Sequence, residues 1–238
     1  MAWIDDQLVA RGIGDARVLD AMRRVPRHEF VQHDALWLAY ADRALPIGDG
    51  QTISQPYMVA AMTEALGLQG HERVLDVGTG SGYQAAILAE LAREVVTIER
   101  RAELADAARE RLARLGYRNV RVIVGDGSIG REEDGPFDGI LVAAASPRVP
   151  ASLKHQLADG GRLVIPVGSP DEQRLTIVTR EGPHYLESVR EGCVFVPLVG
   201  RKGGLNRYKK RLERRSFPKG AQPLRIVPTS AFIKRGSL

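Results

Sequence analysis

The chain has 238 residues and a net charge of +5, and its 44% hydrophobic and 26% charged residues are ordinary for a soluble globular protein of one large domain. The longest near-apolar run, around residues 140–145, is too short to span a membrane, and one cysteine, Cys193, excludes an internal disulfide framework and is too few for a structural zinc site. The acids Asp5 and Asp6 stand where a secretory signal needs basic residues, so we expect a cytoplasmic protein.

The first 40 residues are predicted to be helical. Apolar residues recur at helical spacing in residues 4–9 and again in residues 18–22, and Pro26 ends the second of these helices. Residues 42–56 follow neither the helical nor the strand period, which predicts a long irregular loop. A helix is then expected over residues 56–66, because proline suits a first helical position and glycine at position 67 suits the end.

From residue 73 onward, short apolar strands alternate with helices. The expected strands are residues 74–77, 95–99, 120–124, 137–144 and 162–167, and the expected helices are residues 83–93, 101–115 and 152–158. Strand–helix–strand units of this length form right-handed crossovers and a parallel sheet. Two late strands, residues 175–179 and 194–198, have no helix between them and are expected to form an antiparallel edge.

The predicted fold is therefore α/β, with a doubly wound, mostly parallel sheet and an N-terminal helical addition. We expect one domain over residues 1–200, in which residues 1–56 supply the N-terminal helices and the loop, and a basic C-terminal extension over residues 201–238. The extension contains 12 Lys and Arg and a single acid, Glu213, whereas residues 1–200 contain 22 basic and 28 acidic residues. It could bind nucleic acid or another acidic surface. A solvated extension is the simpler interpretation, and we favour it.

A glycine-rich turn follows the first strand of the predicted sheet, where Gly78, Gly80 and Gly82 stand at alternate positions. Ligands bind at the carboxyl ends of parallel strands, and glycine there allows a sharp turn and a close approach. A dinucleotide-binding turn needs its last glycine at position 83, which is Tyr83, so the turn argues against NAD or FAD. Asp76, just before the turn, favours a ligand with a cationic or amino group, such as S-adenosylmethionine.

Two more acids follow neighbouring strands. Glu99 ends the second strand of the sheet, where a carboxylate can accept hydrogen bonds from both ribose hydroxyls. Asp126, between Gly125 and Gly127, follows the third strand and can accept from an adenine amino group. Each acid alone could be a solvated or turn residue. Three acids at the same ends of consecutive strands favour a site for S-adenosylmethionine.

With these residues in view, the chain resembles the protein-L-isoaspartate O-methyltransferase family. The resemblance runs from about residue 8 to residue 198, and we see no further correspondence beyond it. Its most specific segment is residues 45–57 (LPIGDGQTISQPY), and residues 25–31 (VPRHEFV) and 195–198 (FVPL) also match. The resemblance implies a Rossmann-like class I methyltransferase that methylates the α-carboxylate of L-isoaspartyl residues. The methyl ester then closes to a succinimide, and hydrolysis returns some normal aspartate.

The resemblance also implies roles for individual residues. Ser54 would be the active-site serine, and the substrate would be contacted by Thr52, Ile53, Ser54 and Val199. The cofactor S-adenosylmethionine, whose product is S-adenosylhomocysteine, would be held by Ile53, Gln55, Pro56, Asp76, Gly78, Thr79, Gly80, Ser81, Gly82, Glu99, Arg100, Asp126 and Gly127. The five histidines lack metal-ligand spacing, so no metal site is expected.

A carboxylate substrate is already ionised at neutral pH and needs no general base, so Ser54 is expected to position a carboxylate oxygen. Ser54 or Gln55 could also cap the helix that begins at Pro56. The resemblance implies that the partners are isoaspartyl-containing proteins and peptides, and we expect no membrane among them. Two alternatives stay open at this point. One is a methyltransferase that acts on a normal aspartate of one dedicated peptide. The other is a non-catalytic module that binds nucleic acid through residues 201–238.

Overall fold

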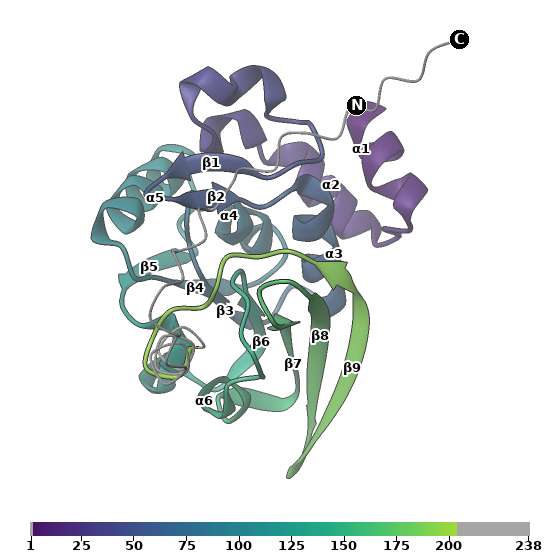
Figure 1. Ribbon diagram of the computed structural model, residues 1–238, viewed down its shortest axis with the longest axis vertical. Coiled ribbons are helices and arrows are strands. Elements are labelled where there is room, and N and C mark those ends of the chain that lie inside the picture. The colour runs from purple at the N-terminus through teal and green to yellow at the C-terminus, as the bar shows by residue number, and fades with distance from the viewer. Residues whose placement is uncertain (1, 204–238) are drawn as a thin grey trace, which may run out of the picture. The chain divides into compact units, whose positions relative to one another are not determined.

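The computed structural model describes residues 2–203, which form an α/β domain around one seven-stranded sheet (Figure 1). Its strands are β3 (Arg73–Val77), β4 (Glu94–Glu99), β5 (Val120–Val124), β6 (Phe137–Val142), β7 (Leu157–Gly168), β8 (Gln173–Glu181) and β9 (His184–Cys193). The strand order is β5-β4-β3-β6-β7-β8-β9. Neighbouring strands from β5 to β7 pair in parallel, and β8 pairs antiparallel with both β7 and β9. The predicted fold class is confirmed.

Helices cover both faces of the sheet. The helices that follow the strands are α4 (Tyr83–Ala89), α5 (Ala102–Arg114) and α6 (Ala151–Lys154), and α3 (Pro56–Leu66) precedes β3. One buried cluster joins α3 and α4 to Val74, Val95 and Leu141, and a second joins α6 to Leu75 and Ile140. Neighbouring strand residues thus enter opposite cores, as side chains that alternate across a pleated strand must. In residues 2–203 no helix is long and apolar enough to cross a membrane.

The strand order reverses beside β3, because β4 and β5 lie on one side of β3 and β6 and β7 on the other. At such a reversal the connections leave in opposite directions and a crevice opens at the carboxyl ends of the strands. The topology therefore places the candidate site above Val77, the last residue of β3.

The N-terminal addition consists of α1 (Ala2–Gln7), α2 (Ala16–Arg24) and short 3₁₀ turns over residues 9–11, 27–30 and 33–38. Asp15 caps α2, because its side chain accepts a hydrogen bond from the Arg17 N–H at 2.8 Å. The apolar residues predicted in α2 are buried. In the preceding set the prediction was wrong for Val9, which is 44% exposed, because α1 ends at Gln7 and the tighter 3₁₀ turn directs Val9 away from the core.

Three of the predicted segments differ from the structure. Residues 42–56 contain a hairpin of β1 (Leu45–Gly48) and β2 (Gln51–Ile53), whose strands are too short to show a period. The helix expected over residues 152–158 is only α6, and β7 begins at Leu157. The last strand within residues 2–203 is β9, and residues 194–198 instead cross the carboxyl edge of the sheet, where Pro197 bridges to Ala145. β9 was missed because most of its residues are exposed, so no apolar alternation marks it.

Candidate active site

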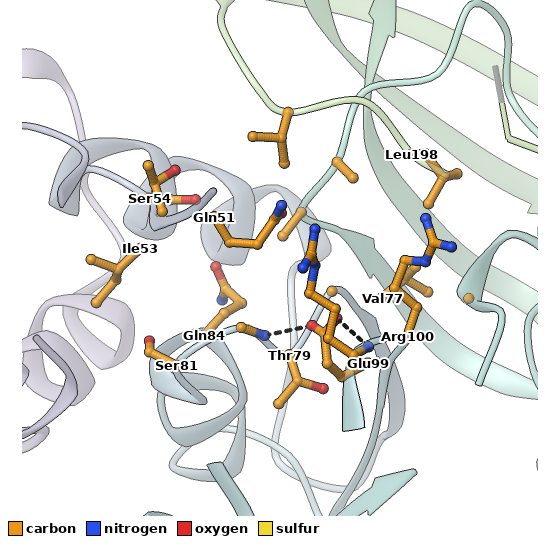
Figure 2. A pocket seen from close by; sticks show the side chains of 18 of the residues that line it. Gln51, Ile53, Ser54, Val77, Thr79, Ser81, Gln84, Glu99, Arg100 and Leu198 are labelled. Atoms are coloured by element: carbon orange, nitrogen blue, oxygen red, sulfur yellow. Dashed lines mark hydrogen bonds between the residues drawn. The ribbon is translucent and has the colours of Figure 1, made fainter. Parts of the chain in front are cut away.

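A cavity opens at the carboxyl ends of β3 and β4, and Figure 2 shows side chains from several segments converging on it. Its lining includes eleven of the residues predicted for the site: Thr52, Ile53, Ser54, Gly78, Thr79, Gly80, Ser81, Glu99, Arg100, Gly127 and Val199. Five others, Gln55, Pro56, Asp76, Gly82 and Asp126, do not line it. The lining also includes residues that the sequence analysis did not single out, among them Gln51, Val59, Tyr83, Gln84 and Arg101.

The glycine turn forms the floor of this cavity. Gly78, Gly80 and Gly82 have φ angles of 101°, 52° and 89°, in the region that favours glycine. A Cβ on Gly82 would come within 3.3 Å of Leu112 in α5, so this glycine also lets α4 pack closely. Tyr83 then begins α4 and is almost fully buried, with its ring 5.3 Å from that of Phe30. The residue that argued against a dinucleotide therefore packs into the N-terminal addition.

Glu99 connects the turn to the end of β4. Its carboxylate accepts a hydrogen bond from the Gly80 N–H at 3.0 Å and another from the Arg101 N–H at 3.1 Å (Figure 2). Two backbone donors hold the side chain in one orientation at the cavity wall. Each carboxylate oxygen can accept a further hydrogen bond, so Glu99 is able to bind neighbouring hydroxyls of a ligand.

Asp76 lies beneath the turn and is fully buried. Thr79 and Thr97 hydroxyls lie 2.6 Å apart, and the Thr97 hydroxyl donates to Asp76 Oδ2 at 2.7 Å, whereas Oδ1 has no partner in residues 2–203. Burial, with a smaller contribution from the charge of Glu99, raises the pKa of Asp76 to about 7. Direct contact between Asp76 and a ligand stays a prediction, because its side chain does not reach the cavity lining.

Asp126 follows β5, and its carboxylate is engaged by the protein itself. Oδ1 accepts from the N–H and hydroxyl of Ser128, and Oδ2 accepts from the Arg201 N–H at 2.7 Å. Burial alone would raise the pKa of Asp126, but these hydrogen bonds hold it below its usual value. A Cβ on Gly200 would lie 1.9 Å from Oδ1, so the contact requires glycine there. The adenine role of Asp126 also stays a prediction.

Ser54 lies at the cavity wall, and its backbone is held by a buried side chain that the sequence analysis did not single out. Arg27 donates from Nη2 to the Ser54 carbonyl at 2.7 Å and from Nε to the Ala39 carbonyl at 2.8 Å. Its guanidinium also lies over the Tyr83 ring, 4.8 Å from the centroid. Burial lowers the pKa of Arg27, while Tyr83 and Asp42 oppose that shift. The only signal in the sequence was the position of Arg27 inside the segment 25–31.

The predicted capping role of Ser54 or Gln55 was wrong. Neither side chain caps α3, and the first free N–H of the helix, that of Tyr57, donates to Asp42 Oδ1 at 2.8 Å. Asp42 also accepts from Gln55 Nε2 at 3.3 Å and pairs with Arg11. A remote carboxylate therefore caps the helix, which leaves the Ser54 hydroxyl free for another partner.

Residues 3–203 match the family model described as protein-L-isoaspartate(D-aspartate) O-methyltransferase. The chain belongs to this family. The match extends past Leu198, where the sequence analysis saw no further correspondence, and it includes the Gly200 and Arg201 contacts with Asp126. The match thus spans every described strand, and every described helix except for Ala2, the first residue of α1.

Individual relatives agree with the family assignment. Protein-L-isoaspartate O-methyltransferase 2 of Marinobacter nauticus is 57% identical over 204 residues, which cover 85% of this chain and 93% of the relative. A solved structure of a protein-L-isoaspartate O-methyltransferase has a TM-score of 0.78 at 29% identity and covers 88% of this chain and 69% of its own. The Plasmodium falciparum protein, a putative member solved with S-adenosyl-L-homocysteine, has a TM-score of 0.71 at 28% identity, with coverages of 83% and 97%.

Proposed function

We propose that this protein transfers the methyl group of S-adenosylmethionine to the α-carboxylate of L-isoaspartyl residues in damaged proteins and peptides. The ester product then closes to a succinimide, whose hydrolysis returns some normal aspartate. The observation that carries the proposal is that the Ser54 segment and the glycine turn line one cavity in a chain of this family. Methylation of a normal aspartate in one dedicated peptide is the alternative that the geometry leaves open.

The cavity fits the proposed methyl donor. Glu99 presents a carboxylate for the ribose hydroxyls, and Thr79 and Ser81 add hydroxyl groups in the turn. Gly127 approaches Val77 so closely that a Cβ would lie 2.5 Å from a Val77 methyl, so glycine keeps this wall thin. We propose that these residues hold the donor together with Ile53, Gly78, Gly80 and Arg100. When bound, the donor supplies a methyl group already activated by its sulfonium.

The chain's own contribution is mainly orientation. The substrate carboxylate has a reference pKa of about 4, so no residue has to remove a proton from it at neutral pH. The Ser54 hydroxyl donates a hydrogen bond to one carboxylate oxygen, and Arg27 fixes the Ser54 backbone from behind. Holding the attacking oxygen and the methyl group in line at roughly 3 Å is sufficient for this kind of transfer. The cavity is also lined by apolar residues that help to exclude water from it: Val196, Pro197, Leu198 and Val199.

Labelled methyl transfer to two peptides tests this function. The peptides have the same sequence and differ only in one isoaspartyl or aspartyl residue. We expect the isoaspartyl peptide alone to be labelled, because the inserted backbone methylene moves the carboxylate relative to the chain and only one geometry suits the Ser54 wall. Labelling of the aspartyl peptide alone would support the dedicated-peptide alternative, and labelling of neither would contradict both.

Ser54→Ala tests the role of the hydroxyl. A hydrogen bond to a charged group contributes about 1.5–3 kcal/mol, so turnover of the isoaspartyl peptide should fall by roughly 10- to 100-fold. The dissociation constant of S-adenosylhomocysteine, measured by calorimetry, should change much less. Ser54→Thr keeps a hydroxyl and is the matched control, for which we expect a smaller loss. Unchanged turnover in Ser54→Ala would refute the role.

The domain limits stay a proposal. We propose that residues 1–200 are the methyltransferase domain, with residues 1–56 supplying the N-terminal helices and the substrate loop, and that residues 201–238 are a basic extension. Residues 204–238 lie outside the described part of the chain, and so do all basic residues of the extension except Arg201 and Lys202. We propose that the partners of this protein are damaged proteins that contain isoaspartyl residues. We also propose that the protein is located in the cytoplasm.

A further inference from the structure

Gln84 is a polar residue of the cavity to which the sequence analysis gave no role. It is the second residue of α4, it is only 8% exposed, and it lines the cavity. Figure 2 shows it on the Ser54 side of the cavity, with Glu99 and Arg100 across from it. Polar side chains so deeply buried need hydrogen-bond partners, and their partners reveal which atoms are left over.

The orientation of the Gln84 amide is fixed by Thr63 in α3. The buried Thr63 hydroxyl lies 2.7 Å from the Val59 carbonyl, which can only accept, so the hydroxyl proton is committed to that bond. Towards Gln84 the Thr63 oxygen can therefore only accept. The Gln84 amide nitrogen meets this requirement and donates to it at 2.9 Å. The nitrogen faces Thr63 and the carbonyl oxygen faces away from it.

The carbonyl oxygen of Gln84 is open to the cavity. It accepts no hydrogen bond from residues 2–203, yet it is not among the fully buried side-chain atoms that lack a partner there. An oxygen of a cavity-lining residue that is neither bonded nor sealed must therefore face the cavity. Asp76 presents the opposite case, because its unpartnered Oδ1 is sealed below the turn. Gln84 therefore presents a hydrogen-bond acceptor to the cavity, whereas Asp76 does not.

The geometry points to Gln84 Oε1 as the acceptor for the α-ammonium group of the methyl donor. This inference rests on the proposed function and names the subsite for the methionine end. Glu99 and Gly127 mark the ribose and adenine side, so the methionine end extends towards α4 and Ser54. The ammonium group has only donors, which an amide oxygen satisfies. Thr63 is the positioning residue, because it holds the amide in the accepting orientation.

Calorimetry with two nucleosides tests the assignment. S-Adenosylhomocysteine carries the amino-acid end, whereas 5′-methylthioadenosine lacks it and reports on the rest of the cavity. Gln84→Met keeps the side-chain length and removes the acceptor. We expect about a 10- to 100-fold weaker affinity for S-adenosylhomocysteine and an unchanged affinity for 5′-methylthioadenosine. Equal weakening of both ligands, or of neither, would overturn the assignment.

Two further variants separate the hydrogen bond from packing. Gln84→Glu keeps an acceptor for the ammonium group and adds a negative charge that compensates for the lost donation to Thr63, so S-adenosylhomocysteine should bind within a few-fold of the wild type. Thr63→Val should weaken S-adenosylhomocysteine several-fold in the wild type and have no effect in the Gln84→Met background. An equal effect of Thr63→Val in both backgrounds would assign Gln84 and Thr63 to packing alone. These measurements are binding constants for the donor product and its analogue. They therefore test the Gln84 assignment separately from the question of which peptide is methylated.

Discussion

Arg27→Met is expected to lower methyl transfer to an isoaspartyl peptide by up to about 100-fold, through a loss of kcat and with little change in cofactor affinity. Arg27 donates to the Ser54 carbonyl at 2.7 Å and to the Ala39 carbonyl at 2.8 Å. Without these donors the serine segment loses its attachment to the N-terminal addition. A displacement of about 1 Å from the reactive geometry can cost about 100-fold in rate, even when the substituted residue does not touch the substrate.

The stability effect of the same substitution has two opposing parts. Each buried carbonyl left without a donor costs about 1–3 kcal/mol. Removal of a desolvated guanidinium, whose Nη1 has no partner in residues 2–203, offsets some of that cost. We therefore expect a net loss of only about 1–3 kcal/mol, which urea unfolding can measure. The change in rate should exceed what partial unfolding at the assay temperature explains.

A double-mutant cycle identifies how Arg27 acts. Arg27→Lys keeps the charge but lacks the guanidinium fork that reaches two carbonyls at once, so we expect an intermediate loss of kcat. In the Ser54→Ala background the hydroxyl to be positioned is absent, and Arg27→Lys should then have little further effect. Additive losses in the cycle would show that Arg27 supports the fold in general and not Ser54.

The regular parts of the fold could be predicted because their signals are local. The strands around β3 are apolar runs at crossover spacing, and the turn at Gly78 needs glycine because its φ angle is 101°. The hairpin over residues 45–53 could not be predicted, because strands of three and four residues show no alternation. β9 could not be predicted either, because most of its residues are exposed and lack an apolar face.

Within the candidate site, the sequence indicated which strand ends carry acids but not which acids face the ligand. Asp76 and Glu99 both belong to strands that end at the cavity, yet only Glu99 lines it. The difference arises because Asp76 lies one residue before the end of β3, inside the sheet, whereas Glu99 is the last residue of β4. Arg27 and Gln84 depend on contacts between segments distant in sequence, with Ser54 and Thr63 respectively, and no local pattern predicts such pairs.

The ionisation of Asp76 predicts a large pH effect on stability. Its pKa is 3.8 as the reference value and about 7 in the folded protein, because burial disfavours the charged carboxylate. Between these values the folded state binds more protons than the unfolded state, so stability falls as the pH rises. A pKa shift of about three units corresponds to a contribution of about 4 kcal/mol to the free energy of unfolding. This contribution is present in full below about pH 4 and is lost by about pH 7.

Asp76→Asn removes this titration and is the variant that measures it. Urea unfolding of both proteins between about pH 5 and pH 8 should show the wild type losing stability relative to the variant as the pH rises, by a few kcal/mol. Other carboxylates titrate in both proteins, including Asp134, where ion pairs with Arg121 and Arg131 outweigh burial and lower the pKa, so their effects cancel in the difference. Parallel pH profiles would show that Asp76 is solvated or paired when ionised, and its buried, unpartnered oxygen would then need another explanation. A difference in unfolding free energy between the two proteins that grows with pH would identify Asp76 as a buried carboxylic acid that is protonated beneath the turn, with Thr97 as its hydrogen-bond donor.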